Sequence, residues 1–304
     1  MTLQETQPPL ETQPLMKLGI AATVSGAYRA VFGRFWPLCK AAALPFVLSI
    51  VIGAAGVVVA DTHFTLDLAV QLLSLLPLVI FGIAWGRIVL LGPRSGAIPR
   101  PLLGMRTWIY FGYLLVYLLL FIIPFLLLFA GSIGLTYLAG TTAAGPDPMA
   151  LLAQALWVVP TGFLLYLLLL YVSLRLALVF PAVSVDQRLS LAGSWRLTRG
   201  NGLRFFAAMI LTMLPVVFAV MLFGSFFSNL LVSSIDLGQP GGGLIGPDGS
   251  LSLTAMALFF GPTMVFSIIV QYIAFGLVAA AVAKVYAQFS GWSETGEDML
   301  KRFE

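Results

Sequence analysis

Arginine side chains dominate the chemistry that this sequence offers. A guanidinium group is planar and donates two parallel hydrogen bonds to a phosphate or a carboxylate, so clustered arginines suit the binding of anions. Eight charged residues near the ends of long apolar runs form the candidate contacts for a lipid headgroup or a protein partner: Arg29, Arg34, Arg87, Arg175, Asp186, Arg196, Arg199 and Arg204.

The same residues also fit a structural role. A charge near the end of a membrane span is costly unless it reaches the interface, pairs or faces a polar cavity, which applies to Arg87 and Arg175. Asp186 is the acidic residue near these arginines, and it is predicted to pair with Arg175, Arg188 or Arg196. Two interpretations stand side by side: an anionic-lipid site, or a topology anchor with one local salt bridge.

Groups that support catalysis or hold a cofactor are scarce. The sequence has one histidine, His63, and one cysteine, Cys39, and no Asp or Glu lies in the middle of an apolar run. A phosphodiester hydrolase needs metal ligands and an acid–base pair, and no nucleotide-binding or zinc-protease motif occurs. We therefore expect no enzymatic activity, no metal and no cofactor. A metal held by His63 and outer aspartates such as Asp61 and Asp67 is the arrangement that would reopen an enzymatic interpretation.

The composition indicates that the candidate residues are held in a membrane. Of 304 residues, 60% are hydrophobic and 9% are charged, whereas a soluble domain carries about 25% charged residues. A water-soluble fold has no interior large enough to hide this much apolar surface, so lipid must cover it. The net charge of +4 reflects the basic flanks of membrane spans, and we expect no nucleic-acid partner.

Six apolar runs each exceed the roughly 20 residues that a helix needs to cross the hydrocarbon. Because backbone groups in lipid must bond to one another, these runs are predicted to be helices, and the fold class is all-α, a polytopic integral membrane protein. The predicted spans are 38–60, 68–91, 109–139, 151–180, 203–232 and 256–287, in a membrane domain over 15–287 between a disordered tail (1–14) and a short tail (288–304). Each span contains a proline, which kinks a helix.

Charge is distributed on one side of these spans. All sixteen Lys and Arg residues flank the same ends, while the opposite connections carry no basic residue and contain Asp61, Asp67, Asp147, Asp236 and Asp248. Basic residues near membrane spans stay on the cytoplasmic side. We therefore predict a multi-pass protein with both termini in the cytoplasm.

Two similar segments precede the first and the fifth spans. Gly26–Gly33 aligns with Gly193–Gly200, since a glycine, an aromatic residue, an arginine and a closing glycine recur in register. Arg34 and Arg204 each stand eleven residues before a proline. The repeat favours three helical hairpins of one orientation. Parallel repeats occur in transporters, and duplication of a structural bundle explains the pattern equally well.

Each of these segments is predicted to form a short cytoplasmic helix on the membrane surface. In the first, an apolar stripe recurs at helical spacing, with Arg29 opposite it; the stripe contains Ile20, Val24, Ala27, Val31 and Phe35. Such a pattern is typical of an interfacial helix. The second helix is predicted over 189–199, and Gly200-Asn201-Gly202 would end it because Gly and Asn tolerate the left-handed cap.

Between Arg175 and Asn201 the chain resembles a known group of membrane proteins. An arginine near a span end is followed by Pro181-Ala182, by Asp186 and by the segment Ser194-Trp195-Arg196-Leu197-Thr198-Arg199-Gly200 before the next span. This pattern is similar to the membrane domain associated with glycerophosphoryl diester phosphodiesterases and to related uncharacterised bacterial integral membrane proteins. The resemblance implies a protein of the bacterial inner (plasma) membrane. It does not imply the phosphodiesterase reaction, which in that family belongs to a separate soluble domain with histidine and acidic residues.

Two functional hypotheses follow from these features. The first is a non-enzymatic integral membrane protein that binds anionic phospholipid headgroups, or a membrane partner, at its cytoplasmic basic face. The second is a transporter or lipid translocator with a cavity between kinked helices, favoured by the repeat, the prolines and the Gly/Pro-rich outer loop over 233–252. The second hypothesis requires a polar cavity that reaches the middle of the membrane.

Overall fold

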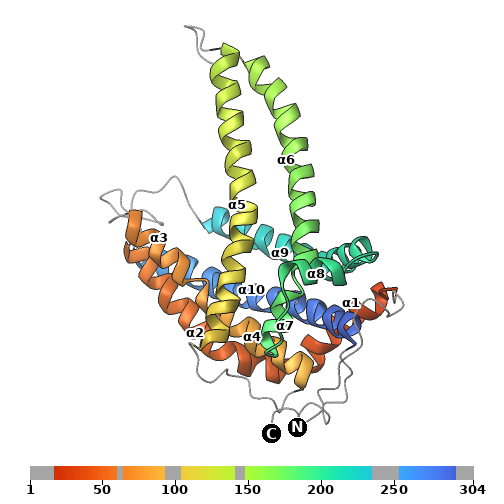
Figure 1. Ribbon diagram of the computed structural model, residues 1–304. Coiled ribbons are helices and arrows are strands. Elements are labelled where there is room, and N and C mark those ends of the chain that lie inside the picture. The colour runs from red at the N-terminus through yellow and green to blue at the C-terminus, as the bar shows by residue number, and fades with distance from the viewer. Residues whose placement is uncertain (1–16, 60–63, 93–103, 141–147, 235–252, 292–304) are drawn as a thin grey trace, which may run out of the picture.

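A computed structural model describes residues 17–59, 64–92, 104–140, 148–234 and 253–291. The predicted tail over 1–14, most of the outer loop over 233–252, and Arg94, Arg100, Lys301 and Arg302 lie outside these residues. The predicted tail over 288–304 lies outside them from residue 292 on, and its residues 288–290 belong to the last described helix. Within them every regular element is an α-helix (Figure 1). The helices are α1 (Ile20–Gly33), α2 (Phe35–Val59), α3 (Phe64–Leu73), α4 (Leu76–Leu91), α5 (Met105–Gly140), α6 (Pro148–Leu176), α7 (Val179–Ser184), α8 (Leu191–Leu197), α9 (Gly202–Ser234) and α10 (Leu253–Ser290).

Within the described ranges, six helical segments are long and apolar enough to cross a membrane, which confirms the predicted all-α polytopic class. They are Phe35–Gly56, Thr65–Leu91, Met105–Gly131, Leu156–Ser184, Gly202–Phe226 and Thr263–Ser290. Arginines lie at one set of helix ends, at Arg34 before α2, Arg87 in α4, Arg106 in α5, Arg175 in α6 and Arg204 in α9. We call this end of the molecule the basic end.

Two predicted spans are each divided into two helices. The span 68–91 was expected to be continuous, but α3 ends at Leu73 and α4 begins at Leu76; the span 151–180 is likewise divided after Leu176. Pro77 stands four residues after Leu73, where α3 ends, and Pro181 stands five residues after Leu176, where α6 ends. A proline ring clashes with the carbonyl four residues before it and donates no hydrogen bond to that carbonyl. Pro45, Pro124, Pro160 and Pro215 remain inside continuous helices.

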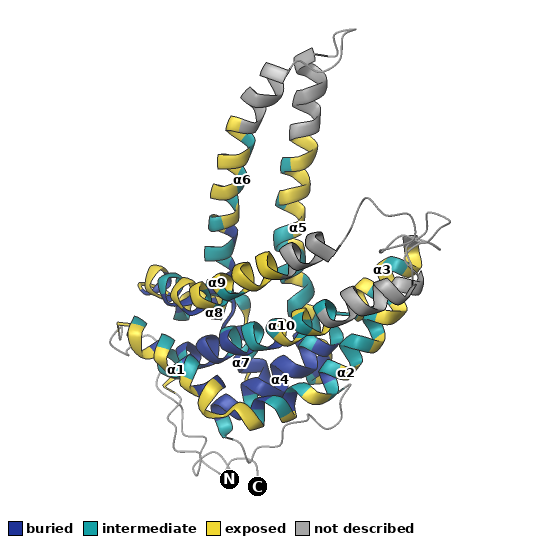
Figure 2. Cartoon of the chain, turned by 180° about the vertical axis from the view of Figure 1, so that it is seen from behind, coloured by how far each residue is buried: buried dark blue, intermediate teal, exposed yellow. Residues whose placement is uncertain are grey.

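The packed core lies between α4 and α10. The indole Nε1 of Trp85 donates a buried hydrogen bond to the carbonyl of Gly276 over 2.8 Å, and Phe81 stacks on Trp85 with ring centroids 6.5 Å apart. A Cβ at Gly276 would lie 3.1 Å from the Leu38 side chain, so this glycine lets α2 approach closely. Figure 2 shows the buried residues concentrated in α4, α7, α10 and the adjoining part of α1.

The helices α5 and α6 form a hairpin that extends from this core. Beyond its base, the hairpin stands away from α9 and α10 in both ribbon views (Figures 1 and 2). Its large apolar side chains are exposed there, for example Leu127 in α5 and Trp157 in α6. Exposed residues of this kind need lipid around them, because water would not solvate a continuous apolar surface.

The helices α1 and α8 correspond to the two predicted short helices, and both pack against other helices of the protein. In α1, Ala27 and Val31 are buried and Arg29 is exposed, as the predicted stripe requires, but Phe35 is half-exposed and begins α2. Contacts with α9 and α10 bury α1, and the Tyr28 hydroxyl donates to the Thr212 carbonyl over 2.9 Å.

The second short helix, α8, has a defined start and end. It begins after Ser190, whose hydroxyl accepts a hydrogen bond from the Gly193 amide over 3.0 Å. It stops before Thr198, and Gly200 has a φ of +78°. The helix is therefore shorter than the predicted 189–199, and its C-cap, Thr198, has a φ of −83°. The left-handed conformation occurs in the turn that follows, at Gly200.

Candidate functional site

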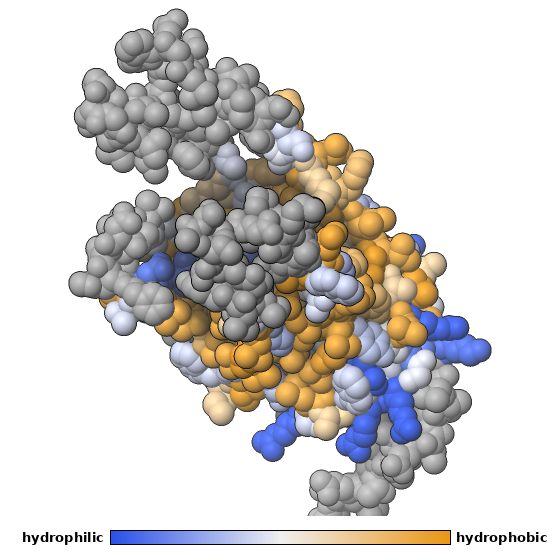
Figure 3. Space-filling model, turned by 90° about the horizontal axis from the view of Figure 1, so that it is seen from above, coloured by the Kyte–Doolittle hydropathy of each residue, from blue (hydrophilic) through white to orange (hydrophobic). Residues whose placement is uncertain are grey.

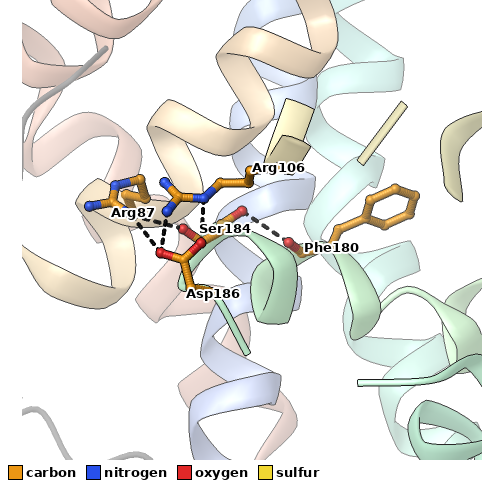
Figure 4. A network of polar contacts seen from close by, with 5 residues as sticks. All are labelled: Arg87, Arg106, Phe180, Ser184 and Asp186. Carbon is orange, nitrogen blue, oxygen red and sulfur yellow. Dashed lines mark hydrogen bonds and ion pairs between the residues drawn. The ribbon is translucent and has the colours of Figure 1, made fainter. Parts of the chain in front are cut away.

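Asp186 connects three helices at the basic end. Arg106 of α5 donates two hydrogen bonds to its carboxylate, one from Nε to Oδ1 over 2.7 Å and one from Nη2 to Oδ2 (Figure 4). Arg87 of α4 lies alongside, with Nη1 3.9 Å from Oδ2. The partners are therefore Arg106 and Arg87, and the predicted pairing with Arg175, Arg188 or Arg196 is wrong.

The position of Asp186 follows from the way in which α7 ends. Its φ of +60° is in the left-handed region, and Asp tolerates this region better than most residues other than Gly and Asn. Backbone bonds from Asp186 to the Val183 carbonyl and from Gln187 to the Ala182 carbonyl close the end of the helix. This closure turns the carboxylate toward the first turn of α5.

Arg87 is held by the same helix end. Its Nη1 donates to the Ser184 carbonyl over 3.2 Å, and the Ser184 hydroxyl donates back to the Phe180 carbonyl over 2.9 Å. Only 21% of the Arg87 side chain is exposed. The guanidinium therefore neutralises the carbonyl end of α7 and the Asp186 carboxylate together.

Arg175, at the end of α6, is held by α8. Its Nε donates to the Thr198 hydroxyl over 3.0 Å and its Nη2 to the Trp195 carbonyl over 2.9 Å. The guanidinium also covers the Trp195 ring at 3.6 Å from the centroid, an attractive cation–π geometry. Ser194 completes the contact, because its buried hydroxyl donates to the Arg175 carbonyl over 2.7 Å.

Asn201 has a comparable structural role. Its side-chain oxygen accepts a buried hydrogen bond from the Leu18 amide over 3.0 Å. This bond attaches the chain before α1 to the turn between α8 and α9. At the next residue, Gly202, a Cβ would lie 2.6 Å from the Tyr171 hydroxyl oxygen, so the backbone approaches α6 here more closely than any side chain allows.

The structure divides the eight predicted site residues into two groups. Arg34, Arg87, Arg175 and Asp186 bond to other parts of the protein; Arg34 donates to the Ile88 carbonyl over 3.3 Å. The other group is exposed, and its side chains make no hydrogen bond or ion pair with any residue that the structure describes; it contains Arg29, Arg196, Arg199 and Arg204. Sequence reasoning missed Arg106 because nothing local links it to Asp186, 80 positions away.

Three of the exposed arginines gather at the turn between α8 and α9. Arg196, Arg199 and Arg204 lie within nine positions, and the Leu18–Asn201 bond brings Lys17 beside them. We call these four residues the junction patch. Seen from above, hydrophilic side chains gather along one margin of a mostly hydrophobic surface, on the side where Figure 1 places α1 and α8 (Figure 3).

Negative charge is scarce in this part of the protein. Within the described residues the acidic side chains are Asp67 of α3 and Asp186, and Asp186 already bonds to Arg106. No cluster of three His, Cys, Asp or Glu side chains exists in the part of the chain that the structure describes. His63 and Asp61, the residues of the alternative outer metal site, lie outside it.

A cavity of about 260 Å³ lies at the base of the α5–α6 hairpin. Residues of α4, α5, α6, α7 and α10 line it, and most of them are apolar. The lining contains no charged side chain. It therefore differs from the polar cavity that the transporter hypothesis requires.

The structural roles of Arg175, Ser194, Trp195 and Thr198 explain why these residue types occur together at this spacing. They do not test the family resemblance noted for this segment, which stays an expectation. Comparison of the chain with known protein families, with curated proteins and with solved structures found no match.

Proposed function

We propose that this protein is a non-enzymatic integral membrane protein whose junction patch binds anionic phospholipid headgroups at the cytoplasmic surface of the membrane. One observation carries the proposal: four exposed cations lie together, and none of their side chains pairs with an acid within the described residues. The anion that balances them must then come from outside this part of the chain.

The surroundings of the patch suit a membrane surface better than a soluble anion. Leu203, between Arg199 and Arg204, is 74% exposed, and Trp195 is 38% exposed. Apolar and indole side chains next to basic residues are typical of the headgroup region. Each Lys or Arg held near an anionic surface contributes about 1 kcal/mol, and a guanidinium binds phosphate through two parallel hydrogen bonds.

The experiment compares two variants that each lose two exposed, unpaired arginines. Arg196→Gln/Arg199→Gln removes charge from the junction patch, and Arg29→Gln/Arg188→Gln removes the same charge elsewhere. Native mass spectrometry then measures how much phosphatidylglycerol and phosphatidylcholine each purified protein retains. We expect the patch variant to bind phosphatidylglycerol about thirtyfold more weakly, as the loss of about 2 kcal/mol implies.

The neutral lipid controls for binding that does not depend on charge, and the second variant controls for the loss of charge outside the junction patch. Retention of phosphatidylcholine should be equal in all three proteins, because that headgroup carries no net charge. Equal retention of phosphatidylglycerol by the wild type and the patch variant would refute the proposal. An equal loss in both variants would show a diffuse basic surface in place of a site, and would refute it as well.

A further inference from the structure

We infer that the cavity at the base of the α5–α6 hairpin holds part of one acyl chain of a membrane glycerolipid, with the Ser173 hydroxyl donating to an ester carbonyl of that lipid. This inference is independent of the junction patch, because it depends on different residues and on the apolar part of the lipid.

The first support is the character of the cavity. Its volume of about 260 Å³ exceeds the roughly 150 Å³ of an engineered apolar cavity that stays dry and binds benzene. The lining consists of side chains such as Phe121, Leu170 and Phe275, which offer water few hydrogen bonds. An apolar guest is therefore favoured over water, and the volume suits a segment of chain more than a whole lipid.

The second support is an unpaired polar group in the lining. Ser173 is only 5% exposed, and its hydroxyl makes no hydrogen bond with any residue that the structure describes. Buried hydroxyls almost always have a partner. The neighbouring Ser173 carbonyl accepts a hydrogen bond from the Tyr117 hydroxyl over 2.5 Å, which places the two side chains next to each other in the lining. A guest that brings its own acceptor would satisfy the Ser173 hydroxyl.

Ser173 also lies at about the depth in the membrane at which the ester groups of lipids are found. It stands two positions before Arg175, whose guanidinium bonds to α8 and stacks on Trp195. Arginine and tryptophan mark the interface between hydrocarbon and water, and two helical residues span about 3 Å. The ester carbonyls of a bilayer lie just inside this interface.

A lipid has a route into the cavity from the bilayer. Beyond its base, the α5–α6 hairpin diverges from α9 and α10 (Figures 1 and 2). The side chains near the diverging stretch are large, apolar and exposed, for example Leu119 and Ile123 of α5. The inferred lipid would approach the cavity along this apolar surface.

The first experiment uses photolabelling of the full-length protein in vesicles. The vesicles contain phosphatidylcholine with a diazirine in the middle of one acyl chain, and mass spectrometry maps the labelled residues. We expect Phe121, Leu170 and Phe275 to be labelled. Ala279→Phe, which fills the cavity from the α10 wall, should abolish this labelling, whereas Ala43→Phe on the exposed face of α2 should leave it unchanged. Unchanged labelling in Ala279→Phe, or labels on outward-facing residues alone, would overturn the inference.

The second experiment tests the hydrogen bond and needs no bulky substitution. Native mass spectrometry compares the retention of diacyl phosphatidylcholine with that of its dialkyl ether analogue, which lacks the carbonyl oxygens. The wild type should prefer the ester lipid by about fivefold, the value of one hydrogen bond, and Ser173→Ala should show no preference. A wild type that does not discriminate would overturn the assignment of Ser173. Because both experiments use a zwitterionic lipid, their failure would leave the junction-patch proposal untouched.

Discussion

Arg106 and Asp186 lie 80 positions apart and form a two-pronged ion pair that joins the first turn of α5 to the end of α7. Arg87 approaches the same carboxylate from α4. The contacts of the α5–α6 hairpin with the rest of the protein are confined to its base. This pair therefore holds the hairpin where it joins the core.

We expect Asp186→Asn to destabilise the fold by about 1 kcal/mol, because it leaves Arg106 and Arg87 close together without a counter-charge. Asn tolerates the φ of +60°, so this variant isolates the loss of charge. Asp186→Ala loses the charge and adds backbone strain of about 1–2 kcal/mol. Thermal unfolding in detergent should rank the wild type first, then Asn, then Ala. An Asn variant as stable as the wild type would contradict this account of the ion pair.

Arg175→Lys should lower stability by about 2 kcal/mol, because lysine keeps the charge but cannot reproduce the fork to Thr198 and Trp195 or the stacking on the indole. The matched control is Arg199→Lys, since the Arg199 side chain bonds to no described residue. Its expected change is within about 0.5 kcal/mol. Urea or heat unfolding of the two variants measures the difference between their free energies of unfolding. Equal stabilities would contradict the stabilising role of the contacts between Arg175 and α8.

Gly82→Ala should destabilise the protein by about 1–3 kcal/mol through overpacking. A Cβ at this position would lie 2.3 Å from the Tyr110 hydroxyl oxygen and 3.2 Å from a ring carbon of Phe275, so the Tyr110 ring would have to shift within the cavity that it lines. Gly112→Ala in α5 is the control, because a Cβ there meets nothing within 4 Å. That change should stabilise its helix by up to about 1 kcal/mol. Opposite shifts in the unfolding temperature are the expected result.

Tyr28 should make the stability of the protein depend on alkaline pH. Burial raises the pKa of the Tyr28 hydroxyl above its usual value of 10.0, and the neutral form donates to the Thr212 carbonyl. The folded state thus retains a proton that the unfolded state releases. Stability is fully present below pH 10 and is lost as the pH rises from there through the folded pKa. Tyr28→Phe should flatten this part of the unfolding profile, and an unchanged alkaline slope would contradict the prediction.

The sequence was sufficient to predict the membrane class, because helix length and hydropathy are local properties. The turn after α8 was also predictable, and Gly200 adopts a left-handed conformation in it, although α8 ends at Leu197 and not at residue 199. The breaks before Pro77 and Pro181 were not predicted. Pro45, Pro124, Pro160 and Pro215 lie within unbroken helices, so proline alone does not decide whether a span is divided.

The side-chain partners were predicted less well than the helices. The contact of Asp186 with Arg106 depends on how α5 meets α7, and no spacing in the sequence encodes that approach. Which arginines bond within the protein also depends on tertiary structure. Arg175 and Arg199 both lie near the end of an apolar helix in the sequence, but Arg175 donates to Thr198 whereas Arg199 is exposed.

The packing of α1 has a consequence for biogenesis. This helix is translated before α9 and α10, yet it contacts these two later helices, and Ala27 and Val31 are buried in the folded protein. The bond from Leu18 to Asn201 likewise waits for the synthesis of 183 further positions. During synthesis α1 therefore lacks these contacts until α9 and α10 have been made, and a product that stops before α10 leaves the buried face of α1 without its largest set of partners.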